Sequence, residues 1–112
     1  MTSREHLGEF EQLVLLAVAR LGADGYGTTI RREIERRTGR SVSVGALYAT
    51  LERLERKGHV TAREGEPTAR RGGRAKRHYR LSGAGVHALG EARGMLDRMW
   101  DGVELGTEPG TS

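Results

Sequence analysis

The sequence of 112 residues contains no cysteine, and no apolar run approaches the roughly 20 residues that a membrane-spanning helix needs. The missing cysteines exclude disulfide bonds and thiolate chemistry, and they fit a reducing compartment. The first ten residues, MTSREHLGEF, lack the apolar core of a secretion signal. We therefore expect a cytoplasmic protein without membrane association. Its length is typical of one domain with one modest core.

Signatures of catalysis are missing as well. The histidines show no close metal-ligand spacing, and no glycine-rich loop follows a strand as phosphate-binding loops do. The segments RREIERR and LERLERKG have the charge spacing of helix surfaces with i,i+4 ion pairs. We predict that the protein is not an enzyme and needs no metal or other cofactor.

Positive charge is concentrated in one part of the chain, although the net charge is only +4. Residues 63–82 carry seven Lys and Arg against two acidic residues, whereas residues 1–62 carry ten against eight and residues 83–112 two against five. Such a basic segment is often a solvated loop, but its density also indicates an anionic partner such as nucleic acid.

Two helices are predicted before residue 40. In the first, GEFEQLVLLAVARLG, apolar residues recur at helical spacing, but Leu15, Leu16 and Val18 extend them around the helix. We expect this helix to face the core on one side and a second surface on the other. The next helix places Tyr26, Ile30 and Ile34 on one face, and Gly39 is a natural end.

A third helix is predicted over residues 43–58, with Ser43 as its N-cap. One face is a core stripe of Val44, Leu47, Leu51 and Leu54. The opposite face has small side chains in its first turns and basic ones later, namely Gly45, Ala46, Ala49, Arg53, Arg56 and, toward the flank, Lys57. A solvated face normally carries long polar side chains from its first turn, so this face is expected to contact a partner.

Two strands, Val60–Glu64 and Lys76–Leu81, follow, and Pro67, Gly72 and Gly73 fit a hairpin tip between them. Three helices and then a hairpin are the order of a winged helix-turn-helix. We therefore predict a mainly α fold with a small β-hairpin, in which residues 1–82 form the winged helix-turn-helix domain.

Four segments in this order resemble the PadR family of bacterial transcriptional regulators: LGEF, YGTTIRREIERRTG, SVSVGALYATLERLERKGHV and GGRAKRHYRLSGAG. The resemblance covers residues 7–90. The short remainder resembles the small PadR subgroup, whose C-terminal part is one dimerising helix. The resemblance implies a homodimeric regulator, most often a repressor, that binds a double-stranded DNA operator. The alternative is a winged helix that binds a protein or RNA.

The small residues of the third helix would let its backbone approach the floor of a major groove, and alanine methyls would meet thymine methyls. Arg53 is the candidate for a bidentate guanine contact. Ser43 and Thr50 would donate to bases or phosphates, although Ser43 could simply cap the helix and Thr50 simply be exposed. The predicted contacts of this helix are Ser43, Gly45, Ala46, Tyr48, Ala49, Thr50, Arg53 and Lys57.

The resemblance also implies that Tyr48 and Tyr26 contact the DNA backbone, while Tyr26 as an aromatic filler of the core remains an alternative. In the hairpin, Arg74, Lys76 and Arg77 are predicted to reach phosphates or a minor groove. Strand alternation points Arg77 inward together with Tyr79 and Leu81, which favours Arg74 and Lys76.

The segment 83–105 is predicted to be a dimerisation helix. A two-heptad seam comprises Leu89, Ala92, Leu96, Met99 and Val103. Two heptads are too few for an autonomous coiled coil, so we expect Leu15 and Leu16 to complete the dimer interface. A fourth core helix is the alternative. Residues 106–112 are expected to be a disordered tail.

Trp100, with Met95 and Met99 nearby, forms a candidate platform for a flat hydrophobic or aromatic effector. The resemblance supports this, because some small PadR proteins sense such compounds at their dimer interface. The alternative is that Trp100 packs the end of the helix. The sequence does not identify an operator or a regulated gene.

Overall fold

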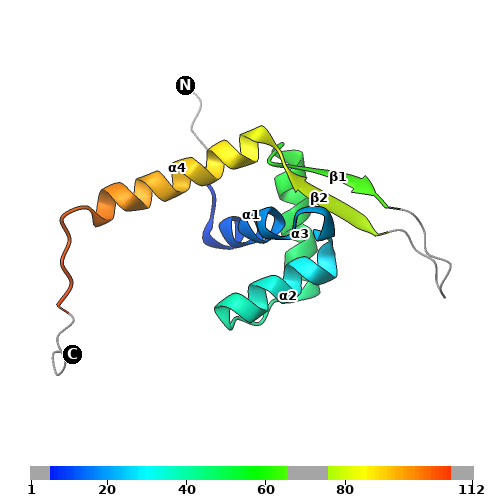
Figure 1. Cartoon of the computed structure of the whole chain (residues 1–112), viewed down its shortest axis with the longest axis horizontal. Helices are drawn as coiled ribbons and strands as arrows, with labels where there is room; N and C mark the ends of the chain where they lie inside the picture. Colours follow the sequence, from blue (N-terminus) through cyan, green and yellow to red (C-terminus); the bar gives the residue numbers. More distant parts are fainter. Residues whose placement is uncertain (1–5, 66–75, 107–112) are drawn as a thin grey trace.

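This computed structural model describes residues 6–65 and 76–106. They form four α-helices, a short 3-10 helix and one two-stranded sheet, joined by short connections (Figure 1). In chain order the elements are α1 (Glu9–Leu21), the short 3-10 helix η1 (Gly22–Asp24), α2 (Gly27–Thr38), α3 (Val44–Arg56), β1 (Val60–Glu64), β2 (Arg77–Leu81) and α4 (Gly83–Trp100). The predicted fold, mainly α with a small hairpin, is confirmed. The predicted hairpin tip, with Pro67, Gly72 and Gly73, lies outside the described residues.

The end of α2 and the beginning of α3 lie where the sequence predicts them, whereas α3 ends at Arg56, before the predicted end at residue 58. Gly39 follows α2 with a left-handed φ of 74°, which its lack of a β-carbon permits. The hydroxyl of Ser43 accepts a hydrogen bond from the Ala46 backbone N–H at 3.1 Å and so caps α3. These two caps set the short connection between the helices.

The core lies between α1, α2, α3 and the sheet. Its fully buried large side chains include Leu15, Ile30, Leu47, Leu51 and Leu54. Leu15 is 0% exposed, so its predicted place in a dimer interface is wrong: it packs in the core of its own chain. Val44, predicted in the core stripe, is 55% exposed, and the core instead contains Val42 just before the helix.

The sheet is antiparallel, with Val60 opposite Leu81 and Glu64 opposite Arg77. Tyr79 is buried, as the predicted alternation requires. The Tyr79 backbone N–H donates to the Gly25 carbonyl at 2.8 Å, and Tyr26 forms an isolated bridge with His78. These contacts join the beginning of α2 to the wing strand β2.

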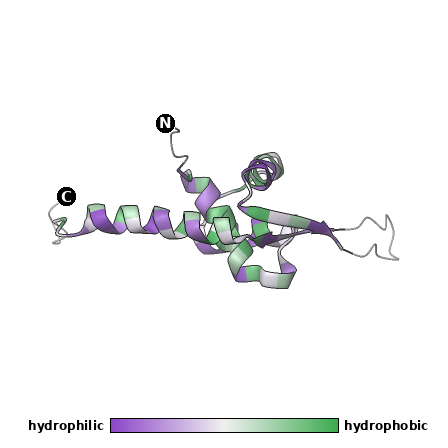
Figure 2. Ribbon diagram, turned by 90° about the horizontal axis from the view of Figure 1, so that it is seen from above, coloured by the Kyte–Doolittle hydropathy of each residue, from purple (hydrophilic) through white to green (hydrophobic). Residues whose placement is uncertain are grey.

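Helix α4 projects from the body on the side away from the wing (Figures 1 and 2). Its N-terminal and central part packs on the domain, where Ala92 is buried and Leu89 is half-buried against the core. The helix ends at Trp100, and Gly102 follows with a φ of 80°. The prediction that the helix includes Val103 and reaches residue 105 is therefore wrong. The predicted tail lies outside the described residues apart from Gly106.

Candidate nucleic-acid interface

The outward face of α3 carries small side chains in its first two turns. Gly45, Ala46 and Ala49 are exposed, and a β-carbon built on Gly45 would meet no described atom within 4 Å. Farther along the helix, Glu52 and Arg56 are also exposed. Glu52 was not among the predicted residues of this face, although helical spacing places it beside Ala49. The face is therefore bare at first and then carries both signs of charge.

Thr50 and Ser43 differ in what they present to solvent. Thr50 is 3% exposed, and its hydroxyl accepts a hydrogen bond from Arg53 Nη2 at 3.4 Å. The prediction that Thr50 faces DNA is wrong, because this position lies at the border of the core. Ser43 is exposed and caps the helix, which leaves its hydroxyl proton available to another acceptor.

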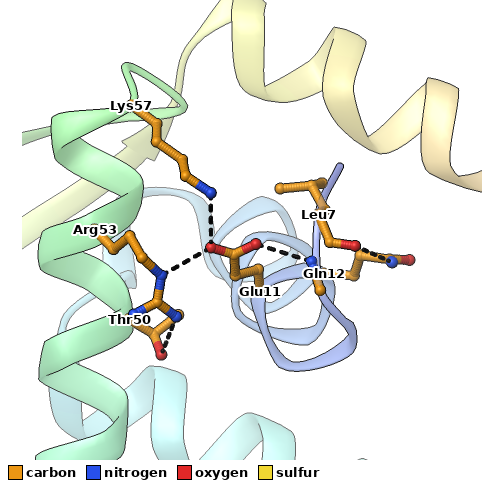
Figure 3. A network of polar contacts seen from close by, with 7 residues as sticks. Leu7, Glu11, Gln12, Thr50, Arg53 and Lys57 are labelled. Atoms are coloured by element: carbon orange, nitrogen blue, oxygen red, sulfur yellow. Dashed lines mark hydrogen bonds and ion pairs between the residues drawn. The ribbon is translucent and has the colours of Figure 1, made fainter. Parts of the chain in front are cut away.

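Glu11 of α1 ties two of the predicted DNA-contacting cations to the domain. Its carboxylate accepts from Arg53 Nε at 3.0 Å and from Lys57 Nζ at 3.1 Å, both to Oε2. Its other oxygen, Oε1, accepts from the Gly8 backbone N–H at 2.9 Å. Figure 3 shows the two cationic side chains reaching from α3 toward α1. Sequence patterns predicted neither contact, because Glu11 occupies the third position of α1 and satisfies an ordinary capping pattern.

The Glu11 carboxylate is held in its charged form. Burial raises the pKa of Glu11, but the hydrogen bonds from Gly8, Arg53 and Lys57 together lower it by more. The pKa of Glu11 therefore lies below its usual value. The Glu11 side chain is 7% exposed, whereas that of Arg53 is 43% exposed. The network thus has a buried anion at its centre and a cation that still reaches solvent.

Tyr48 and Tyr26 connect α3, α2 and the wing. Tyr48 is half-exposed, and its hydroxyl lies over Gly27 in the first turn of α2. The Tyr26 ring meets His78 edge-on at 5.3 Å, and the Lys76 ammonium lies 4.3 Å from the centre of the same ring. Tyr26 therefore supports the wing strand, a role that neither interpretation of the sequence included.

The basic residues of the wing differ in their contacts. Arg77 Nη2 donates to both carboxylate oxygens of Glu55 on α3, at 3.1 and 3.0 Å, and this pairing raises the pKa of Arg77. Lys76 is exposed beside Tyr26, and Arg74 lies outside the described residues. Among the three predicted wing cations, Lys76 is thus the described one that is exposed and for which no ion pair is found in the described residues.

The charged segments of α2 and α3 differ from each other. Within RREIERR, Glu33 accepts from Arg36 and Arg37 at 2.7 Å each, which confirms the predicted local pairing. Within LERLERKG, Arg53 pairs with Glu11 and Glu55 with Arg77, so these charges join α3 to other elements.

A groove of about 500 Å³ runs between α1 and the projecting part of α4. Its apolar lining comprises Leu16, Leu89, Leu96 and Trp100. Leu16 is 49% exposed and Leu96 54%, whereas Ala92 is buried against its own chain. The prediction that Ala92 faces a partner is therefore wrong, and the exposed residues of the predicted seam are Leu96 and Met99 on α4 and Val103 beyond its end. Trp100, Met99, Val103 and Leu105 form an adjoining exposed apolar surface.

Metal sites and membrane-spanning helices are both absent from the described ranges 6–65 and 76–106. No group of three His, Cys, Asp or Glu side chains there is arranged to hold a metal ion. None of the helices in these ranges has the length and apolar character needed to cross a bilayer.

The comparisons with known proteins agree with the geometry. The model of the PadR-like family of transcriptional regulators matches residues 15–91. The chain belongs to this family. The resemblance of the sequence to PadR proteins is thereby confirmed, and the function of the family is transcriptional regulation rather than catalysis. None of the curated proteins matches the chain by sequence.

Several solved structures have a fold similar to that of this chain. A transcriptional regulator from Clostridium thermocellum is 20% identical, with a TM-score of 0.68 over 81% of this chain and 85% of that one. A PadR family transcription regulator from Clostridium difficile is 18% identical, with a TM-score of 0.64 over 84% and 96% of the two chains. The protein in the hsRosR-S1 complex is 25% identical, with a TM-score of 0.64 over 87% and 79%.

Proposed function

We propose that this PadR-like chain is a homodimeric repressor that binds a specific double-stranded DNA operator. The observation that carries the proposal is the exposed, nearly side-chain-free face formed by Gly45, Ala46 and Ala49 at the start of α3. Small side chains let a helix backbone approach base edges closely in the major groove, and flanking contacts to phosphates set its register.

The groups around this face suit a DNA backbone. Ser43 and Tyr48 offer hydroxyl donors at its edges, and Lys76 offers a cation at the base of the wing. Phosphate oxygens are the usual acceptors for such donors. Arg74, at the predicted tip of the wing, and Tyr26 beneath Lys76 would add to the same surface.

Dimerisation is proposed through the groove between α1 and α4. Leu16, Leu96 and Met99 are exposed in the single chain and apolar, so a second copy would remove them from water. A two-fold dimer would place two copies of α3 about 34–36 Å apart, one turn of DNA, and would favour a pseudo-palindromic operator. Repression would follow if the bound dimer occludes the promoter.

Selection of bound sequences from a random duplex library tests this function. We expect enrichment of a motif with two half-sites one helical turn apart, bound at moderate salt. The Ala49→Glu variant, which places bulk and negative charge on the α3 face, serves as the control and should enrich nothing. A wild-type protein that enriches no duplex motif would refute the proposal and favour a protein or RNA partner.

A second role, effector sensing, is favoured by the exposure of Trp100. The indole is 56% exposed and contributes to the groove that Leu16 and Leu96 also line. Met95 and Met99 lie on the same helix and are exposed too. A flat hydrophobic molecule would bury this aromatic surface at the dimer interface.

Titration of flat aromatic cations and phenolic acids, followed by tryptophan fluorescence, tests the sensing role. Trp100 is the only tryptophan of the chain, so the signal reports this site. Free N-acetyltryptophanamide in parallel corrects for inner-filter absorption. Saturable quenching supports the role, and no quenching across the panel contradicts it.

A further inference from the structure

The two flanks of α3 are fixed to different parts of the domain. On one flank, Tyr48 lies over Gly27 of α2 and Glu55 pairs with Arg77 of the wing. On the other flank, Arg53 and Lys57 reach α1 and share Glu11 Oε2 (Figure 3). The second flank is therefore tied to α1 and not to the wing, the element that is proposed to follow the DNA backbone.

The carboxylate of Glu11 holds these cations strongly because it is buried. A buried charge without a partner is strongly destabilising. If Arg53 and Lys57 both left Glu11, its buried carboxylate would have no cationic partner and the folded state would lose stability. DNA phosphates would compete for the same cations, but a cation that moved to a phosphate would leave an anion behind near a polyanion. Both effects favour retention of the network when DNA binds.

A second ion pair of α1 provides a comparison. Glu9 pairs with Arg40 at 2.8 Å, but the Glu9 side chain is 78% exposed and that of Arg40 is 46% exposed. Solvated pairs of this kind are weak, so Arg40 is already available to other anions. Burial of the anion thus distinguishes Glu11 from Glu9 on the same helix.

We propose that Glu11 is a positioning residue that withholds Arg53 and Lys57 from DNA. This inference rests on the proposed function. With both cations held by Glu11, α3 binds DNA through its small-residue face, and Arg53 does not read a guanine. Two fewer cations per chain contact phosphates, which lowers affinity for random duplexes and so raises discrimination for the operator.

The test measures how binding depends on salt. Glu11→Gln keeps the size of the side chain and an oxygen for Gly8 but removes the charge that holds the two cations. Against a random duplex, the slope of log K against log salt should become steeper by about one to two units per protomer. The affinity for the operator should rise less than the affinity for the random duplex. The ratio of operator affinity to random-duplex affinity should therefore fall.

Matched variants separate this effect from a general change of charge. Glu9→Gln removes the same charge from α1 and should leave the slope as in the wild type. The triple variant Glu11→Gln, Arg53→Gln, Lys57→Gln removes the released cations and should restore the wild-type slope. Circular dichroism of each variant checks the fold.

Several outcomes would overturn the inference. Equal slopes for Glu11→Gln and the wild type, or an equal change in Glu9→Gln, would show that Glu11 withholds nothing. Arg53→Gln in the otherwise wild-type chain gives an independent answer if Glu11→Gln does not fold: we expect an unchanged slope, and a loss of about one unit per protomer contradicts the inference. A wild-type protein that binds no duplex would instead refute the proposed function itself.

Discussion

The hydroxyl of Tyr48 occupies the space that a side chain at residue 27 would need. A β-carbon built on Gly27 would lie 1.7 Å from Tyr48 Oη and 2.4 Å from Cζ. Gly27 and Tyr48 therefore act as one contact between the first turn of α2 and the second turn of α3. This contact fixes how α2 and the proposed recognition helix lie against each other.

Gly27→Ala should destabilise the protein because the Tyr48 ring must move. Tyr48 is 44% exposed and can swing outward, so we expect a cost near the lower end of overpacking, about 1 kcal/mol. In a Tyr48→Ala background the same change should be neutral, or stabilising by up to about 1 kcal/mol, because alanine favours a helix over glycine. Urea unfolding of the four proteins measures this cycle. Equal costs in both backgrounds would show that the two residues do not interact.

The contribution of Glu11 to stability should disappear in acid. The folded-state pKa of Glu11 lies below the ordinary value of 4.5, so its charge favours folding above about pH 4.5. This contribution falls as the pH decreases through the folded-state pKa, because both states are then protonated. At pH 7, Glu11→Gln should lower the free energy of unfolding by about 1–2 kcal/mol, and the difference should shrink toward pH 3. Denaturant titrations at several pH values measure it, and a difference that is independent of pH would contradict the assignment.

Local signals predicted much of the fold. Ser43 and Gly39 act through their nearest neighbours, so their effect on helix ends can be read from the chain. The alternation around Tyr79 also placed Arg77 on the Tyr79 face of β2, where it pairs with Glu55, but its side chain is 46% exposed, so the predicted inward direction is wrong.

Interactions between distant residues limited the prediction of the site. Leu15 and Leu16 are equivalent in an all-apolar helix segment, and packing alone decides that Leu15 enters the core. Glu11 and Arg53 are 42 residues apart, and no periodicity joins them. Helix α4 was expected to continue past Trp100 because the apolar spacing of the seam continues to Val103. In the structure the helix ends at Trp100, and Gly102 adopts a positive φ.

Leu96→Asp should separate the proposed dimer without unfolding the chain. Leu96 is 54% exposed in the single chain, so aspartate is tolerated there but would be buried and unpaired in the interface. Sedimentation at micromolar concentration should give a dimer for the wild type and a monomer for Leu96→Asp. His87→Asp is the control, since His87 lies nine residues earlier, on the opposite side of α4, and is exposed. A monomeric wild type would contradict the proposed assembly.

Lys76→Ala should weaken DNA binding without changing sequence preference. Lys76 is exposed beside the wing, so its expected contact is a phosphate. Affinity for operator and random duplexes should fall alike, and the salt slope should decrease by about one unit per protomer. Arg98→Ala, on the remote end of α4, should change neither quantity. A loss confined to the operator would indicate that Lys76 reads a base instead.

Ala49→Glu tests the recognition surface most directly. Ala49 is exposed at the C-terminal end of the bare face of α3, and glutamate is nearly as good a helix former as alanine, so the fold and the dimer should persist. In a major groove, however, the longer side chain would meet base edges and bring a negative charge between two rows of phosphates. Operator binding should fall at least tenfold, the effect of about 1.4 kcal/mol. Ala84→Glu, an exposed alanine in the first turn of α4, makes the same chemical change away from the proposed DNA surface and should bind as the wild type does. If Ala49→Glu binds the selected operator as tightly as the wild type, this face of α3 does not enter the groove.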